Sequence, residues 1–191
     1  MAHRLSRWLR RISTGWVALA MTGIFLLFTA LVLPTQADQA EAETGGGASP
    51  DTSFVYTPAD LYAMAEAYGA SGRRAYVRAR FTFDLIWPLV YLAFLAAVIS
   101  WLVGRAFPGT DWIQLANLAP VLGALFDYLE NVSTSLVMIR YPARTPVVAL
   151  LAPIFTAVKW IFVGGSFGLL AVGVVGAAVR AIRSRQGGEG P

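Results

Sequence analysis

Four ionisable residues lie inside apolar stretches of this 191-residue chain: Asp84, Asp127, Glu130 and Lys159. Ionisable residues at such positions are the best indicators of function in a membrane segment. Asp127, Glu130 and Asn131 are spaced i, i+3 and i+4, which places them on one face of a helix. Because an isolated carboxylate in hydrocarbon is costly, we expect this face to point into protein or a watered cavity, with Lys159 as its counter-charge.

Arg80 is a second cation, four residues before Asp84 and able to pair with it on a helix. Three carboxylates nevertheless face one lysine at membrane depth, so the surplus needs an arginine, a proton, a cation or a cationic ligand. The group could be a structural clasp, a ligand-binding or catalytic pocket, or part of an ion pathway. In a catalytic pocket, Asp127 or Glu130 would be the general acid or base and Lys159 the electrostatic stabiliser.

The available residue types limit the chemistry. Asp84, Asp127, Glu130 and Asn131 offer oxygen atoms of the kind that Mg²⁺ and Ca²⁺ prefer, but their spacing is not specific, so we predict no metal and no cofactor. The chain has no cysteine and a single histidine, His3. This excludes disulfides, thiol catalysis, zinc–histidine sites and Ser–His–Asp triads.

The composition predicts an integral membrane protein. Hydrophobic residues make up 57% of the chain and charged residues 14%, whereas soluble domains have about 45–50% and 25%. Apolar runs long enough to cross about 30 Å of hydrocarbon must be helical, since backbone groups in lipid have to pair internally. We therefore predict an all-α membrane four-helix bundle with an extracytoplasmic amphipathic loop helix. Its spans are expected at residues 15–33, 81–103, 112–139 and 146–179.

Arginine placement predicts the topology. With residues 1–14 and 180–191 as cytoplasmic tails and Arg105 in the inner loop, eight arginines lie inside and six outside, which favours two cytoplasmic termini in a bacterial inner membrane. The apolar run from Trp16 to Leu33 is longer than a usual signal-peptide core, so we expect an uncleaved helix rather than cleavage near Ala37 or Ala40. The arginines flank apolar segments, which indicates the lipid bilayer as partner and not nucleic acid.

The outer segment has two parts. Residues 34–56 are rich in Ala, Gly and acids, and we interpret them as a flexible linker. Residues 57–80 should form amphipathic helices, because Thr57-Pro58-Ala59-Asp60 has the pattern of a helix capping box. A stripe of Leu61, Met64, Ala65 and Tyr68 follows. Gly69 and Gly72 should end this helix, and Ser71 could cap the next. We expect residues 58–68 to form a partial lid.

Depth connects the candidate residues. At about 1.5 Å per residue from the inner helix ends, Asp84, Asp127, Glu130 and Lys159 all lie about 22–31 Å deep, in the outer half of the bilayer. Arg73 and Arg74 could face lipid phosphates or the pocket carboxylates. The complete set of ligand-binding candidates is Arg73, Arg74, Tyr76, Arg80, Asp84, Tyr91, Asp127, Glu130, Asn131 and Lys159.

Small residues recur in the fourth expected span. Gly164-x-x-x-Gly168 and Gly173-x-x-x-Ala177 permit close helix approach, within the chain or in a homo-oligomer. The tail after Arg185 should be disordered.

The motifs Tyr68-Gly69-x-x-Gly72-Arg73-x-x-Tyr76, Phe81-Thr82-x-Asp84-x-x-x-Pro88-x-x-Tyr91 and Asp127-x-x-Glu130-Asn131 together resemble a family of small bacterial four-helix membrane proteins of no assigned activity. The resemblance covers roughly residues 55–180 and implies membrane location and a shared polar site, but no reaction. The chain is similar in architecture alone to the emopamil-binding and sigma-2-receptor-like proteins. It lacks the intramembrane histidine expected of their isomerase branch.

These observations predict a protein whose outward-facing polar cluster binds a lipid-like ligand or a membrane protein partner, or acts as a structural clasp. An enzyme that acts on a lipid or isoprenoid is one alternative. An ion- or proton-coupled transporter is another, although no partner acids appear in the inner half of the spans.

Overall fold

The computed structural model describes residues 1–46, 48–107 and 111–186. It is 87% helical, with no strand among the described residues. Short 3₁₀ turns, labelled η, interrupt the helices. In chain order the elements are α1 (Ala2–Ile12), α2 (Gly15–Leu31), α3 (Leu33–Thr44), η1 (Pro50–Thr52), α4 (Pro58–Ala67), α5 (Gly69–Arg80), α6 (Phe83–Ala106), α7 (Asp111–Gln114), η2 (Leu115–Leu118), α8 (Ala119–Arg140) and α9 (Pro146–Gln186).

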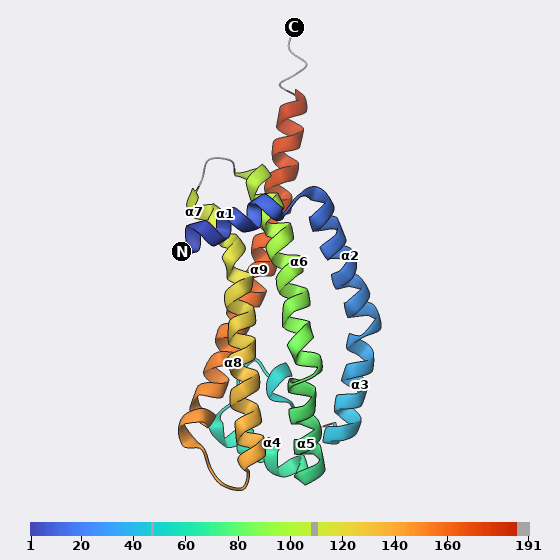
Figure 1. Ribbon diagram of the computed structural model, residues 1–191, viewed down its shortest axis with the longest axis vertical. Helices are drawn as coiled ribbons and strands as arrows, with labels where there is room; N and C mark the ends of the chain where they lie inside the picture. Colours follow the sequence, from blue (N-terminus) through green and yellow to red (C-terminus); the bar gives the residue numbers. More distant parts are fainter. Residues whose placement is uncertain (47, 108–110, 187–191) are drawn as a thin grey trace.

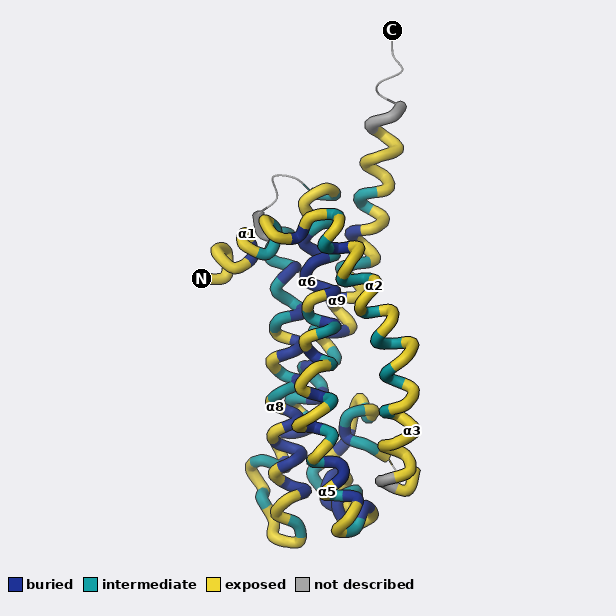
Figure 2. The backbone as a smooth tube through the Cα atoms, turned by 45° about the vertical axis from the view of Figure 1, so that its right-hand side comes forward, coloured by how far each residue is buried: buried dark blue, intermediate teal, exposed yellow. Residues whose placement is uncertain are grey.

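The centre of the molecule is formed by α6, α8 and α9, which run side by side (Figure 1). Helix α2 packs along α6 on the outside, and much of its surface and of α9 is exposed (Figure 2). Helix α1 crosses one end of the bundle, here called the α1 end. Helices α4 and α5 lie at the opposite end, the α4–α5 end, where α4 packs on α8 and α9 (Figure 1).

Three helical segments are long and apolar enough to cross a membrane: Gly15–Ala42, Gly69–Ala106 and Pro146–Arg183. Helix α8 is not among them, so four spans are not confirmed. The polar residues of α8 explain this, since they lower its mean hydropathy. The expected span over 112–139 is not one continuous helix, because α7 and η2 precede α8 and Pro120 lies in the first turn of α8.

The linker predicted over residues 34–56 is helical in its first part. Ala, Gln and Glu are good helix formers, and α3 extends to Thr44. The glycines then stop the helix, since Gly45 and Gly46 have φ of 76° and 72°, left-handed values that favour glycine. The turn η1 follows and brings the chain back against α9.

The capping box predicted at the start of α4 is confirmed. The Thr57 hydroxyl accepts a hydrogen bond from the Asp60 backbone N–H at 3.2 Å, and the Thr57 N–H donates to Asp60 Oδ2 at 2.8 Å. On the predicted stripe, Leu61, Ala65 and Tyr68 are buried. The break at Gly69 is also present, with φ of 61°. Ser71, however, lies exposed within α5 and does not cap it.

Small residues permit close packing inside the chain at several places, and Gly123 and Gly173 are two of them. A Cβ atom on Gly123 would come within 2.9 Å of Val163 Cγ2, and one on Gly173 within 3.0 Å of Leu102 Cβ. Gly164 and Gly168 are exposed and face open space. Of the expected cytoplasmic tail, residues 180–186 continue α9, and residues 187–191 lie outside the described part.

Candidate functional site

Lys159, from the middle of α9, is the centre of a buried charge cluster near the α4–α5 end. Its Nζ lies 2.6 Å from Glu130 Oε2, 2.7 Å from Asp51 Oδ1 and 3.7 Å from Asp127 Oδ1. Lys159 is 3% exposed and Glu130 is fully buried. The predicted pairing of Lys159 with the acidic face of α8 is therefore present.

Arg80, the last residue of α5, is the second cation of the cluster. Its Nε lies 2.8 Å from Asp84 Oδ2, so the predicted pair is present, but it bridges the junction of α5 and α6 and not a turn of one helix. Its Nη1 lies 3.4 Å from Asp51 Oδ2. Asp51 thus contacts both cations. The ion pairs form a continuous chain from Asp84 through Arg80, Asp51 and Lys159 to Glu130.

Asp51 is the functional candidate that the sequence analysis missed. It belongs to η1, inside the segment interpreted as a flexible linker, and is 108 residues away from Lys159 in the sequence. The available signal was an acidic residue directly after a proline, ahead of the capping box. Because α8 already carries more acids than Lys159 can balance, the sequence gives no reason to expect a further carboxylate in the cluster.

Hydrogen bonds hold the acidic face of α8 in place. Tyr91 OH donates to Asp127 Oδ2 at 2.9 Å, and Asn131 Nδ2 lies 3.4 Å from Asp127 Oδ1. Tyr76 OH donates to Thr134 Oγ1 at 3.1 Å, and the Tyr76 ring lies under the Arg80 guanidinium, 4.8 Å away. These contacts bring the predicted residues Tyr76, Tyr91 and Asn131 into or beside the cluster.

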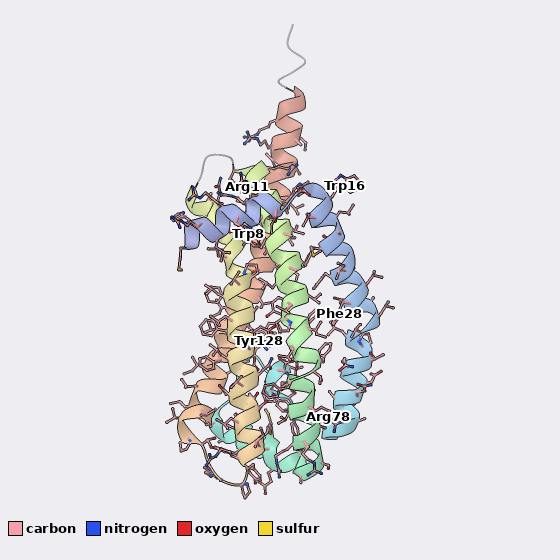
Figure 3. The ribbon with its side chains drawn as sticks, in the orientation of Figure 1. Trp8, Arg11, Trp16, Phe28, Arg78 and Tyr128 are labelled. Carbon is pink, nitrogen blue, oxygen red and sulfur yellow. The ribbon has the colours of Figure 1, made fainter. Side chains whose placement is uncertain are left out.

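Two further contacts join elements around the cluster. Tyr56 OH and Thr156 Oγ1 are 3.1 Å apart, which joins the segment after η1 to α9. Tyr128, labelled in Figure 3, donates to the Leu85 carbonyl at 2.9 Å and joins α8 to α6. The cluster is thus fixed from several elements.

Charge is unequal within the cluster, because four carboxylates (Asp51, Asp84, Asp127 and Glu130) face the two cations Arg80 and Lys159. Among the described side chains, the buried atoms Glu130 Oε1 and Asn131 Oδ1 have no hydrogen-bond partner. A proton shared by the acids would supply a donor there and reduce their mutual repulsion.

The groups of the η1 segment show how the cluster acts on its surroundings. Burial opposes ionisation of Asp51, but the charges of Lys159 and Arg80 outweigh it and hold the pKa of Asp51 well below its ordinary value. Burial raises the pKa of the Tyr56 hydroxyl, so Tyr56 stays a neutral hydrogen-bonding group.

The carboxylates of Asp51, Asp127 and Glu130 approach one another closely enough to hold a metal ion, with oxygen atoms within 4.8 Å. The same three groups surround the Lys159 ammonium. A metal ion would have to displace this ammonium, which occupies the space between them and offsets part of their charge. Asp84 and Asn131, which the sequence offered as further oxygen donors, are not in this group of three.

A cavity of about 530 Å³ lies between α3, the η1 segment and the junction of α5 and α6. Asp51, Arg80 and Asp84 form its charged wall. The lining described for this cavity does not include Asp127, Glu130 or Lys159, which lie beyond Asp51. The other lining residues are Leu33, Gln36, Ala37, Ala40, Glu41, Gly46, Ser49, Thr52, Ala79 and Phe83.

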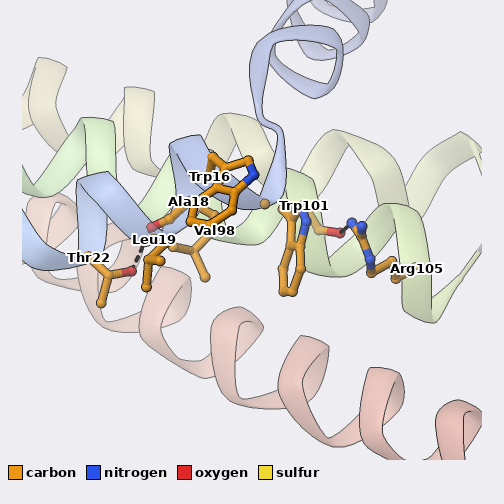
Figure 4. Close-up of a pocket in the computed structure, with 8 residues that line it drawn as sticks. Trp16, Ala18, Leu19, Thr22, Val98, Trp101 and Arg105 are labelled. Carbon is orange, nitrogen blue, oxygen red and sulfur yellow. Dashed lines mark hydrogen bonds between the residues drawn. The ribbon is translucent and has the colours of Figure 1, made fainter.

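A second cavity, of about 630 Å³, lies between α2 and α6 towards the α1 end (Figure 4). Trp16, Trp101 and Arg105 line it, and the Arg105 guanidinium stacks on the Trp101 ring at 4.2 Å. Its described lining contains no carboxylate and no part of the charge cluster. It lacks the paired acids and bases that distinguish the first cavity.

Arg73 and Arg74 lie apart from the cluster. Arg73 donates to the Ala65 carbonyl at 2.7 Å and stacks on the Tyr141 ring at 4.8 Å. Both arginines line a separate hollow of about 290 Å³ that also contains Tyr141. Of the two predicted roles, contact with the pocket carboxylates is therefore not observed.

Comparison of the chain with protein-family models, with curated proteins and with solved structures finds no match. The motif resemblance described above therefore assigns the chain to no family.

Proposed function

We propose that the chain is an integral membrane protein of four spans that binds a lipid-like ligand in the cavity between α3, η1 and the α5–α6 junction. The observation that carries this proposal is that Asp51, Arg80 and Asp84 belong both to the buried ion-pair chain and to the cavity wall. A costly buried charge network that opens on a cavity is typical of a ligand site.

The cavity suits an amphipathic molecule. Leu33, Ala37 and Phe83 provide apolar surface, whereas Glu41, Asp51 and Asp84 provide carboxylates. Because acids outnumber cations there, a head group that carries an amine would be favoured, with its positive charge beside the carboxylates. A membrane protein partner that inserts a basic side chain is the alternative occupant.

In this proposal α8 is the fourth span, since it lies between two apolar helices that cover it and its polar residues face the bundle interior. The arginine distribution supports cytoplasmic termini and an outward-facing cluster in a bacterial inner membrane. Helix α4 packs on α8 and α9, and the described lining of the cavity includes no residue of α4, so the partial lid expected over residues 58–68 is not part of this proposed site.

A structural clasp is the second candidate, and the double pairing of Asp51 favours it. Asp51 joins an irregular outer segment to Arg80 and Lys159 at once. Buried ion pairs of this kind can specify packing without adding much stability. The enzyme hypothesis has less support, because Asp127, Glu130 and Lys159 are not in the described cavity lining. A transport path would need a second group of buried acids towards the α1 end, and the part of the chain whose burial is described contains none there.

Native mass spectrometry of the mildly extracted protein tests ligand binding. Ala37→Trp would fill the cavity without removing a charge, and Ala20→Trp, on the exposed surface of α2, is the matched control. We expect a stoichiometric small molecule on the wild type and on Ala20→Trp, and at least about tenfold less on Ala37→Trp. Equal retention on both variants, or no bound molecule on the wild type, would leave only the clasp.

A further inference from the structure

Helix α1 presents three distinct faces, which follow from its residue spacing. Ser6 and Ser13, 2% and 6% exposed, face the bundle together with the half-buried Leu9 and Arg10. Leu5, Trp8 and Ile12 recur at i, i+3 and i+7 and form an apolar stripe. Arg4, Arg7 and Arg11 have the same spacing and form a basic stripe beside it.

The inner face of α1 is attached to the bundle by specific hydrogen bonds. Ser6 Oγ donates to the Gln114 carbonyl at 2.8 Å. Asn117 Nδ2, fully buried, donates to the Ser6 carbonyl and to Ser100 Oγ at 3.2 Å and 2.9 Å. These bonds hold α1 across the end of the helical bundle, and so across the direction in which α6 and α9 run (Figure 1).

The two outer stripes remain exposed. Leu5, Trp8 and Ile12 are 42%, 54% and 43% exposed. Arg4, Arg7 and Arg11 are exposed as well, and α1 has no acidic residue. Trp8 and Arg11 project from α1 in Figure 3. Exposed apolar and cationic stripes side by side are the pattern of a helix that lies in the plane of a membrane surface.

We propose that α1 lies in the membrane interface and that its basic stripe binds the phosphate head group of an anionic phospholipid. A hollow of about 580 Å³ lined by Arg4, Arg7, Trp8, Arg10 and Arg11 is the binding site. Arginine pairs with phosphate through two parallel hydrogen bonds, and tryptophan is enriched at this depth of a bilayer. The bilayer is the favoured occupant because the adjacent apolar stripe needs hydrocarbon, which a nucleic acid or an acidic protein surface does not offer.

Spin labelling of the full chain in lipid nanodiscs tests the position of α1, and the absence of native cysteines makes single-site labelling clean. Ile12→Cys places a nitroxide on the apolar stripe, and His3→Cys places one on the exposed polar side. We expect the Ile12 label to be more accessible to oxygen and the His3 label to a water-soluble nickel reagent. Equal exposure of both labels to the nickel reagent would overturn the interfacial position.

Lipid selectivity tests the head-group site. Native mass spectrometry would compare retention of phosphatidylglycerol and phosphatidylcholine on the wild type and on Arg4→Gln/Arg7→Gln/Arg11→Gln. The control is Arg78→Gln/Arg140→Gln/Arg144→Gln, which removes three exposed arginines at the other end. We expect the α1 variant alone to lose about tenfold or more in phosphatidylglycerol affinity. Equal loss in both triple variants, or equal retention of the two lipids by the wild type, would overturn the proposal.

Discussion

The charge cluster near the α4–α5 end and helix α1 at the other end balance positive charge in opposite ways. Near the α4–α5 end, Arg80 and Lys159 are 8% and 3% exposed, and each contacts at least two carboxylates. At the α1 end, Arg4, Arg7 and Arg11 are exposed on a helix without acids. Charge enclosed by protein must be balanced within the chain, whereas charge at the surface is balanced from outside. Arginine therefore fixes structure inside the cluster, whereas on α1 it is free to bind.

Replacement of Lys159 by Met should have the largest effect. It leaves Asp51, Asp127 and Glu130 without their shared cation, and breaking a buried pair in this way costs about 3–5 kcal/mol. Thermal unfolding in detergent measures the loss. Arg78→Gln, at an exposed position in the neighbouring α5, should change stability by no more than about 0.5 kcal/mol.

A double variant keeps this test useful if Lys159→Met folds poorly. Glu130→Gln removes one of the buried charges that Lys159→Met leaves unpaired, so the double variant should be more stable than the single one. If Lys159→Met alone unfolds at the wild-type temperature, the cluster does not hold this end together.

Helix packing provides a test that changes no charge. Gly123→Ala brings a methyl group against Val163 in the contact between α8 and α9, and overpacking of this kind costs about 1–3 kcal/mol. Gly164→Ala faces open space and should be nearly neutral. Thermal unfolding of the pair shows whether fit, apart from charge, holds the two helices together. Equal stability of the two variants would contradict the close contact at Gly123.

Asp51→Asn should reduce stability by about 1 kcal/mol at neutral pH, a modest value because a third of the Asp51 side chain is exposed. Its pKa in the folded state lies below the ordinary 3.8. The ionised form is therefore the stabilising one, present above the unfolded pKa and lost as the pH falls through the folded value.

The difference in unfolding temperature between wild type and Asp51→Asn should accordingly be constant above about pH 5 and shrink as the solution is acidified. Subtracting the two curves removes the titration of the other acids. A difference that grows on acidification would show that Asp51 is not the bridging anion.

The smallest stability effect is expected at the α1 end. Arg4→Gln/Arg7→Gln/Arg11→Gln should leave the unfolding temperature in neutral detergent almost unchanged, since exposed substitutions away from special features usually change stability by no more than about 0.5 kcal/mol. A loss as large as that of Lys159→Met would remove the contrast between the two ends.

The features that could be predicted from sequence are those set by local spacing or by the cost of burying charge. The Thr57–Asp60 cap and the Arg80–Asp84 pair follow from three- and four-residue intervals. The pairing of Lys159 with the acidic face of α8 follows from the cost of burying either charge without a counter-charge.

What could not be predicted depends on distant parts of the chain. Asp51 joins the cluster because the chain folds back after α3, and no local pattern specifies that return. The linker interpretation does not anticipate α3, because it treats the alanines and acids before Thr44 and the glycines after it as one segment. Helix α8 begins at Ala119, and the sequence does not show this start, because apolar content alone does not distinguish a long helix from the short turns of α7 and η2.

The position of Lys159 also bears on how the chain enters a bilayer. Helix α8 reaches the membrane before α9 during synthesis and is not apolar enough to qualify as a span by itself. Its carboxylates find their cation only when Lys159 arrives with the next helix. In a four-span arrangement, α8 and α9 would therefore insert as one hairpin, in which Lys159 of α9 offsets the charge of Asp127 and Glu130 of α8. The last helix would then complete the membrane solubility of the one before it, and truncation before α9 would leave α8 outside the bilayer.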